Sequence, residues 1–235
     1  MKKILAYHSI GDPVKETGAN LYCVSEANFR KQMKCAKDSA ITITFDDGDI
    51  TNYTKAYPIL KALGMTAHFF IIGEWVGAPG YMDWRQIKEL QDSGMTIGSH
   101  GMTHRILTTL SDAELDHEFT DSKKLLEENL KVRITSFSIP RGLTNRKVIE
   151  KAKWCGYAKI FTSNPHDNDG VLFGRIVVRS DWDMKRFESI VNNGPSFRDN
   201  AVIFIKNTSR KILGDENYDK LRTTIINLRP TSSNL

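Results

Sequence analysis

The sequence predicts an α/β protein whose strands form a parallel sheet or a β/α barrel. Short runs rich in β-branched and aromatic residues alternate with helical patterns along the 235 residues, which is typical of parallel strands joined by helical crossovers. Chemically capable side chains follow several of these runs, at the strand ends where a barrel assembles its active site. No linker or repeat divides the sequence, so we expect a single domain over residues 1–235.

The expected strands follow one another from the amino terminus at short intervals. They are Lys3–Tyr7, Ile41–Phe45, Thr66–Ile72, Met95–Ser99, Thr135–Ile139, Ala158–Thr162, Arg175–Arg179 and Ala201–Ile205.

Helix signals occupy the intervals between these strands. Ser111 with Glu114 forms a capping box at one helix start. Glycines are expected where helices end, and the three concerned are Gly64, Gly94 and Gly156. Other helix starts are expected at Asp83 or Trp84, Thr144 and Asp183.

Composition and charge exclude several classes of protein. The 33 Lys and Arg exceed the 28 Asp and Glu by only five and form no basic block, so nothing indicates nucleic-acid binding. The apolar runs are far too short for a membrane span. The apolar start reaches His8 after only four residues, which favours a first strand over a signal peptide, and three scattered cysteines favour a reducing compartment. We therefore expect a cytoplasmic protein, without assigning an oligomeric state.

Two adjacent carboxylates follow the strand expected at Ile41–Phe45. Asp46 and Asp47 precede Gly48, which allows the backbone to turn sharply. Adjacent side chains diverge at a strand end, so one carboxylate can bind a cation while the other acts as a base. Asp-Asp-Gly is also a common composition for a polar turn, so this motif alone does not distinguish a site from a turn.

Two histidines four residues apart follow the strand expected at Met95–Ser99. One helical turn between them would bring His100 and His104 to the same cation. Two imidazoles and one carboxylate leave an open position for water, as in a catalytic zinc site. A chance pair on a surface loop is the alternative, and the nearby Asp pair makes it the weaker one.

The other histidines have simpler interpretations. His68 lies in an apolar strand and is expected to be a core residue, while His117 lies on a solvated helix face. His166 lies in a polar loop, where a turn is favoured over a substrate contact.

The motifs resemble those of the polysaccharide deacetylases, the NodB-homology carbohydrate esterases. Thr44–Gly48 and Ser99–His104 resemble the family's first two motifs, and Phe137–Gly142 is similar to the third. The resemblance implies a distorted β/α barrel of about seven strands, with its active site at their carboxyl ends. It implies Asp46 as the general base and the backbone N–H of Arg141 as a donor to the oxyanion. The metal ligands that it implies are Asp47, His100 and His104.

Two positions differ from the usual family pattern. The family has an arginine, which orients the base, where this sequence has Ser138. It has a histidine as general acid after the last apolar strand, where this sequence has Lys206.

The amino-terminal segment suggests which residue supplies the acid. Ile4–Ile10 resembles a segment of a circularly permuted subgroup, similar to the deacetylases of poly-N-acetylglucosamine, in which the strand bearing the acid comes first. This implies His8 as the general acid. We expect Arg179 or Arg141 to hold Asp46 in place of the missing arginine.

The resemblance implies hydrolysis of an N-acetyl group on an aminosugar of a polysaccharide, oligosaccharide or glycan precursor. It also implies a divalent metal, zinc with cobalt or nickel as alternatives. Tyr7, Pro140 and Trp182 are expected to contact the sugar, although Trp182 fits core packing equally well. Other interpretations stay open: cleavage of a formamide or cyclic imide, carbohydrate binding without turnover, or magnesium-dependent phosphate hydrolysis.

Overall fold

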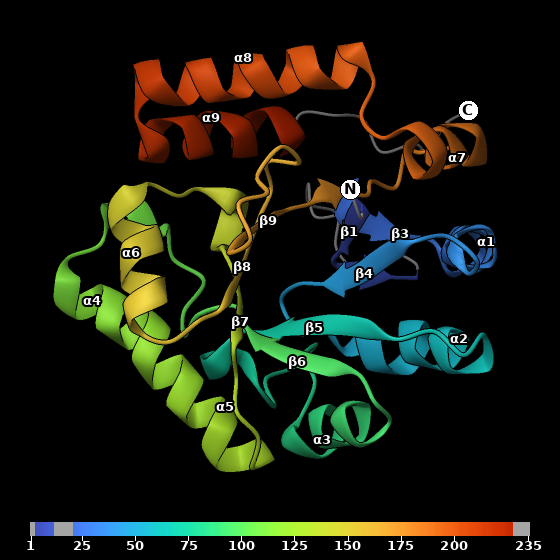
Figure 1. Ribbon diagram of the computed structural model, residues 1–235, viewed down its shortest axis with the longest axis horizontal. Helices are drawn as coiled ribbons and strands as arrows, with labels where there is room; N and C mark the ends of the chain where they lie inside the picture. Colours follow the sequence, from blue (N-terminus) through green and yellow to red (C-terminus); the bar gives the residue numbers. More distant parts are fainter. Residues whose placement is uncertain (1–2, 12–20, 228–235) are drawn as a thin grey trace.

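A parallel sheet of eight strands, curved into a nearly closed and distorted barrel, forms the centre of the molecule (Figure 1). The computed structural model describes residues 3–11 and 21–227. The expected α/β barrel is therefore confirmed. Met1 and Lys2, which begin the segment interpreted as a first strand, lie outside the described residues.

The elements alternate along the chain much as the sequence pattern indicates. The strands are β1 Lys3–Tyr7, β2 Ser9–Ile10, β3 Cys23–Val24, β4 Ile41–Phe45, β5 Ala67–Ile71, β6 Thr96–Ser99, β7 Ser136–Ser138, β8 Lys159–Thr162, β9 Leu172–Gly174 and β10 Ile176–Val177. The α-helices are α1 Glu26–Ala36, α2 Tyr57–Ala62, α3 Trp84–Asp92, α4 Asp112–Asp116, α5 Ser122–Leu130, α6 Arg146–Trp154, α7 Met184–Asn193, α8 Phe197–Leu213 and α9 Asp215–Asn227.

The barrel closes through one short stretch of chain. The strand order is β10-β1-β4-β5-β6-β7-β8-β9, so the two ends of the sheet are β9 and β10. Arg175 alone separates these strands in the sequence, and β9 pairs with β8 while β10 pairs with β1. The residue at the closure is therefore held between the first and last parts of the barrel.

Alternation along the strands separates two groups of buried side chains. Leu5 and Phe69 belong to the large core between the sheet and the surrounding helices. Their sequence neighbours Ile4 and Phe70 point to the opposite face, where they join Phe161 in a smaller cluster. Residues that continue this inner face beyond the strand ends therefore reach the carboxyl-terminal opening of the barrel.

The strand predicted at Ala201–Ile205 is wrong, because these residues form part of α8. The Ser196 hydroxyl accepts a hydrogen bond from the Asp199 backbone, and the Asp199 carboxylate accepts one from the Ser196 backbone. This capping box starts a helix of 17 residues. A five-residue apolar run fits a strand and a buried helix segment equally well. The capping box before it favours the helix.

Because these residues form a helix, Lys206 does not follow a strand of the barrel as expected. Lys206 lies exposed on α8, and the last described strand of the chain, which pairs with β1, is β10. Figure 1 shows α8 and α9 lying side by side outside the barrel.

Most predicted helix starts agree with the structure. Ser111 and Asp83 each form a capping box, and Asp183 caps α7. The cap predicted at Thr144 is wrong, because the side chain of Asn145 accepts the hydrogen bond from the Val148 backbone.

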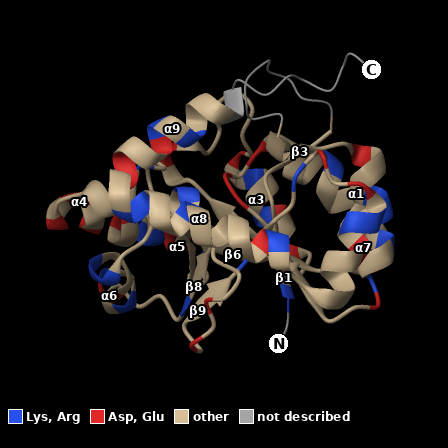
Figure 2. Cartoon of the chain, turned by 90° about the horizontal axis from the view of Figure 1, so that it is seen from above, with Lys and Arg blue, Asp and Glu red and all other residues tan. Residues whose placement is uncertain are grey.

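Charged residues of both signs are distributed over the helices (Figure 2). No helix among the described residues has the length and apolar composition needed to cross a membrane.

Candidate active site

Four strands end at one opening of the barrel, which we call the barrel mouth. His8 follows β1, Asp46 and Asp47 follow β4, His100 follows β6, and the turn at Pro140–Gly142 follows β7. The backbone N–H of Asp46 donates to the carbonyl of Tyr7, which ties the first two of these strand ends together. The convergence expected from the sequence is present.

The two carboxylates diverge because the backbone turns between them. Asp47 has a φ of 72° and Gly48 a φ of 77°, so the chain enters the left-handed region directly after Asp46. A non-glycine residue seldom adopts this conformation and needs support from its surroundings.

The guanidinium group of Arg175 holds Asp46. Its Nη1 lies 2.6 Å from Asp46 Oδ1 and its Nη2 lies 2.7 Å from Asp46 Oδ2, in a two-pronged ion pair. Arg175 Nη2 also donates to Ser138 Oγ, and that hydroxyl donates to Asp46 Oδ2. Burial alone would raise the pKa of Asp46, but the charges of Arg175 and His100 outweigh it and lower the pKa. Asp46 is therefore an ionised carboxylate with a fixed orientation.

Arg175 was not foreseen as the partner of Asp46, and the expectation of Arg179 or Arg141 is wrong. Arg179 pairs with Asp181 at the surface, and Arg141 pairs with Asp219 of α9. Ser138 is short enough for the guanidinium to reach the carboxylate from the barrel closure. The sequence held one indication of this role: Arg175 stands at the start of an apolar run. A charged side chain that is buried with such a run needs a buried partner of opposite charge.

Asp47, His100 and His104 form a group that could hold a metal ion. Their ligand atoms all lie within 4.8 Å of one another. Asp47 Oδ1 lies 3.3 Å from Nε2 of His100 and 3.5 Å from Nε2 of His104. The expected set of three ligands therefore comes together.

The donor set fits a divalent cation. Nδ1 of His100 lies 2.8 Å from the carbonyl oxygen of Ser138 and can donate its N–H to it. Nε2 then carries the lone pair of the neutral imidazole, on the side of Asp47. Asp47 Oδ1 is buried and has no hydrogen-bond donor assigned among residues 3–11 and 21–227, as expected of an oxygen that binds an ion. Burial lowers the pKa of His104 to about 4, against the opposing charge of Asp47, so this imidazole is neutral at pH 7.

His8 lies beside the carboxylates although it is distant from them in the sequence. Burial alone would raise the pKa values of Asp46 and Asp47, but nearby positive charges, that of His8 among them, lower both. Its ring packs 5.1 Å from that of Tyr22, and its carbonyl accepts a hydrogen bond of 2.5 Å from Asn52. Its Nδ1 is buried and has no hydrogen-bond partner among the described residues.

Arg141 occupies a second left-handed turn at the mouth. Its φ is 58° and that of Gly142 is 68°. A Cβ at Gly142 would lie 2.5 Å from the hydroxyl of Ser163, so this turn requires glycine. Burial has the largest effect on the pKa of His104 and lowers it, and the charges of Asp47 and His100 come next. The guanidinium charge of Arg141 lowers this pKa further, so Arg141 lies near the metal ligands.

The residues expected to contact sugar do not present free faces. Tyr7 is fully buried, with its hydroxyl bonded to Gln32. Trp182 is 6% exposed and lies under the guanidinium of Arg186, and Pro140 is buried. Strand alternation turns Tyr7 toward the helices and leaves His8 at the mouth, so the prediction of stacking surfaces at Tyr7 and Trp182 is wrong.

Other aromatic side chains stand at the mouth instead. The ring of Trp75 lies 5.5 Å from that of His104 and 4.9 Å from that of Tyr81. Burial and the charges of Asp47 and Asp49 raise the pKa of Tyr81, which places its hydroxyl near the carboxylates. Both come from the loop after β5, which carries no sequence motif.

The remaining histidines stay outside this group. His68 lies on β5, with its ring 5.6 Å from that of Phe161, and His117 is half-buried and pairs with Asp121. His166 lies in a turn, 3.0 Å from Asn200.

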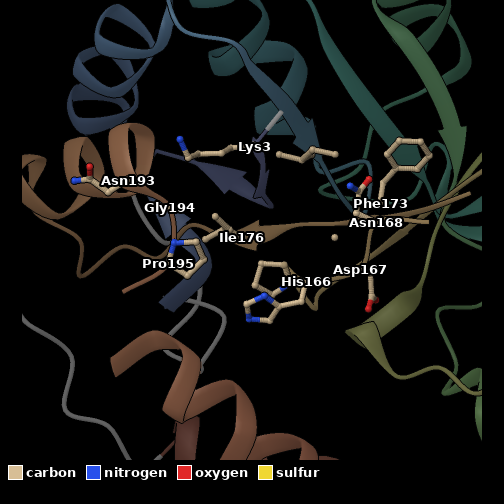
Figure 3. A pocket seen from close by; sticks show the side chains of 12 residues that line it. Lys3, His166, Asp167, Asn168, Phe173, Ile176, Asn193, Gly194 and Pro195 are labelled. Carbon is tan, nitrogen blue, oxygen red and sulfur yellow. The ribbon is translucent and has the colours of Figure 1, made fainter. Parts of the chain in front are cut away.

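A pocket of about 360 Å³ lies at the start of β1, at the other end of this strand from His8. Figure 3 shows side chains that line this pocket. Its lining includes Lys3, His166 and Phe173. Lys3 donates to the last carbonyls of α7, so the pocket is built around a helix end. None of the carboxylates or imidazoles of the barrel mouth lines it among the described residues.

Comparisons with known proteins agree with this geometry. The family model described as polysaccharide deacetylase matches residues 33–160. The chain is 32% identical over 157 residues to a peptidoglycan-N-acetylglucosamine deacetylase of Bacillus cereus, covering 66% of each chain. It is 27% identical over 190 residues to a poly-beta-1,6-N-acetyl-D-glucosamine N-deacetylase of Staphylococcus aureus, covering 73% of this chain and 63% of the relative. The chain thus spans less than two thirds of the length of both relatives.

A solved structure shows the same fold. The Streptococcus pyogenes deacetylase PplD in complex with acetate superposes with a TM-score of 0.74 at 24% identity, covering 81% of this chain and 98% of that one.

Proposed function

Because the chain belongs to the polysaccharide deacetylase family, we propose that it hydrolyses the N-acetyl group of an aminosugar in a glycan and releases acetate. The observation that carries this proposal is the pairing of two adjacent carboxylates with different partners. Asp47 lies near the imidazoles of His100 and His104, while both carboxylate oxygens of Asp46 are hydrogen-bonded to Arg175. One carboxylate is thus suited to a metal ion and the other to a proton.

Asp47, His100 and His104 would hold one divalent ion. We propose zinc, with cobalt and nickel as alternatives, because two imidazoles favour these ions over magnesium. Such an ion, when bound, polarises an amide carbonyl and lowers the pKa of water.

The chain's own groups would complete the reaction at the mouth. Asp46 accepts the proton of the attacking water, and Arg175 keeps its carboxylate aimed at that proton. The backbone N–H of Arg141 donates to the carbonyl oxygen as negative charge develops, a contribution of about two to three orders of magnitude in rate. His8 delivers a proton to the departing nitrogen, so that a neutral amine leaves.

The aromatic side chains beside His104 support a sugar substrate. Trp75 and Tyr81 offer ring faces of the kind on which sugars stack. The names of the two relatives both refer to N-acetylglucosamine, in peptidoglycan for one and in poly-beta-1,6-N-acetyl-D-glucosamine for the other. We therefore propose a glycan that contains N-acetylglucosamine, handled by one catalytic domain over residues 1–235. The cytoplasmic location stays a prediction.

Acetate release from a panel of substrates tests the proposal. The panel holds oligomers of β-1,4- and β-1,6-linked N-acetylglucosamine, a peptidoglycan fragment, a formamide and a cyclic imide, each with zinc, cobalt or nickel. We expect metal-dependent acetate release from at least one aminosugar, and none from Asp46→Asn protein. Turnover of the formamide or the imide alone would reassign the acyl group. Glycan binding without any turnover would overturn the enzymatic proposal.

A further inference from the structure

A buried carboxylate that the catalytic scheme does not use lies behind the metal-binding loop. Glu118 is 1% exposed, although its position beside His117 suggested a solvated helix face. It belongs to a π-helical turn at His117–Asp121, between α4 and α5. A π turn inserts one residue and rotates the helix face, and such turns recur at functional sites.

The carboxylate of Glu118 binds the loop that joins the two metal histidines. Its Oε2 accepts hydrogen bonds from the backbone N–H of Met102 at 2.7 Å and of Thr103 at 3.2 Å. Its Oε1 accepts one from the hydroxyl of Thr103. All three donors come from the residues between His100 and His104, so this loop supplies the hydrogen bonds to the buried carboxylate in the described part of the chain.

The loop is shaped around this carboxylate. Gly101 has a φ of 83°, and a Cβ there would lie 2.5 Å from Glu118 Oε2. His104 adopts a φ of 62°, which a non-glycine residue keeps only when its surroundings hold it.

Backbone bonds fix the other side of the same loop. The N–H of Gly73 donates to the carbonyl of Gly101, and the N–H of Glu74 donates to that of Met102. The N–H groups of Met102 and Thr103 face Glu118, and the carbonyls of Gly101 and Met102 face the segment after β5. Removing the Glu118 carboxylate would therefore leave three donors of Met102 and Thr103 without their acceptor, while Gly101 stays bonded to Ser99.

We propose that Glu118 is a positioning residue that sets the distance and angle between the imidazoles of His100 and His104. The proposal rests on the metal site of the proposed function. Groups that orient metal ligands in this way change metal affinity by about 10-fold to 100-fold when they are removed.

Titration with Co²⁺ alone tests this role without turnover. The dissociation constant and the visible absorption spectrum are measured for the full chain, for Glu118→Gln and for the control Glu127→Gln. Glu127, on the neighbouring helix α5, accepts a hydrogen bond from the Ile134 backbone, away from the metal loop. We expect Glu118→Gln to weaken Co²⁺ binding by about 10-fold to 100-fold and to alter the spectrum, and Glu127→Gln to change neither.

A second variant covers the case in which Glu118→Gln does not fold. Thr103→Val removes one donor to Glu118 and leaves the carboxylate in place, so we expect weaker Co²⁺ binding by several-fold with an altered spectrum. Wild-type affinity and spectrum in folded Glu118→Gln, or in Thr103→Val if the former does not fold, would overturn the positioning role. Wild-type protein that binds no Co²⁺ would overturn the metal site as well. Co²⁺ binding that depends on Glu118, without acetate release from any substrate, would support the positioning role and contradict only the proposed function.

Discussion

The barrel mouth and the α8–α9 hairpin differ in which side chains they bury. At the mouth, the side chains of Asp46 and Arg175 are 6% and 1% exposed, so charges lie in the interior. On α8, Phe204 is 71% exposed and Phe197 is 88% exposed, so large apolar groups face outward. Buried charges are costly unless geometry compensates them, whereas exposed apolar groups cost little. The side chains whose geometry must be exact are therefore those at the barrel mouth, where we propose that the reaction takes place.

The two helices of the hairpin also differ from each other. Asp219 of α9 pairs with Arg141 at the mouth, and Arg222 of α9 donates to the hydroxyl of Tyr22, which packs against His8. Every residue of α8 is described, and none is buried. α9 therefore belongs partly to the site, while α8 lies beside α9 on the outside.

The largest expected effect on stability comes from breaking the buried ion pair. We expect Arg175→Met to lower the free energy of unfolding by about 3–5 kcal/mol, because it leaves the Asp46 carboxylate buried without its partner. Arg179→Met removes a surface pair with Asp181 and should cost less than about 1 kcal/mol. Urea denaturation of both variants measures the difference. Equal losses would mean that the pair at the mouth is no more important to the fold than one at the surface.

The next comparison sets His8 at the mouth against Lys206 on α8. Removing the proton donor to the leaving nitrogen should lower kcat of His8→Ala by about two to four orders of magnitude, with the metal content unchanged. Lys206→Ala should keep wild-type turnover, because its side chain lies on the outer helix. Steady-state rates of acetate release and elemental analysis check both. Near wild-type turnover of His8→Ala would remove His8 from the proton-transfer role.

The residues at the mouth were predictable because strand ends and motifs both mark them. Asp47, His100 and His104 follow expected strands at spacings that suit a cation, and the structure brings them together. Arg175 could not be assigned to Asp46, because its partner depends on which segment closes the barrel. Glu118 was missed for a related reason, since a π turn changes the helix face on which a residue lies.

The hairpin was mispredicted because its local signals conflict. The run Ala201–Ile205 is short, apolar and rich in β-branched residues, which favours a strand. The cap at Ser196 and Asp199 favours a helix, and it lies in a part of the sequence where no motif provides a register. Exposure of the apolar side chains on α8 shows that burial did not decide the outcome.

The smallest expected effect belongs to α8. Phe204→Ala should change the free energy of unfolding by no more than about 0.5 kcal/mol, because the side chain is 71% exposed. Phe45→Ala, at a fully buried position of β4, should cost about 3–5 kcal/mol. Denaturation curves of the two variants compare the regions directly. A loss of several kcal/mol in Phe204→Ala would show that the outer face of α8 is covered in solution.

The division of labour between the two adjacent carboxylates is most directly tested by measuring metal content and acetate release in Asp46→Asn and Asp47→Asn proteins. Asp46→Asn should retain one equivalent of metal and lose most turnover, because an amide cannot accept the proton. Asp47→Asn should lose metal and turnover together, because only two imidazole ligands remain. Equal loss of metal in both proteins, or full metal retention in Asp47→Asn, would contradict the assignment of Asp46 to the proton and Asp47 to the ion.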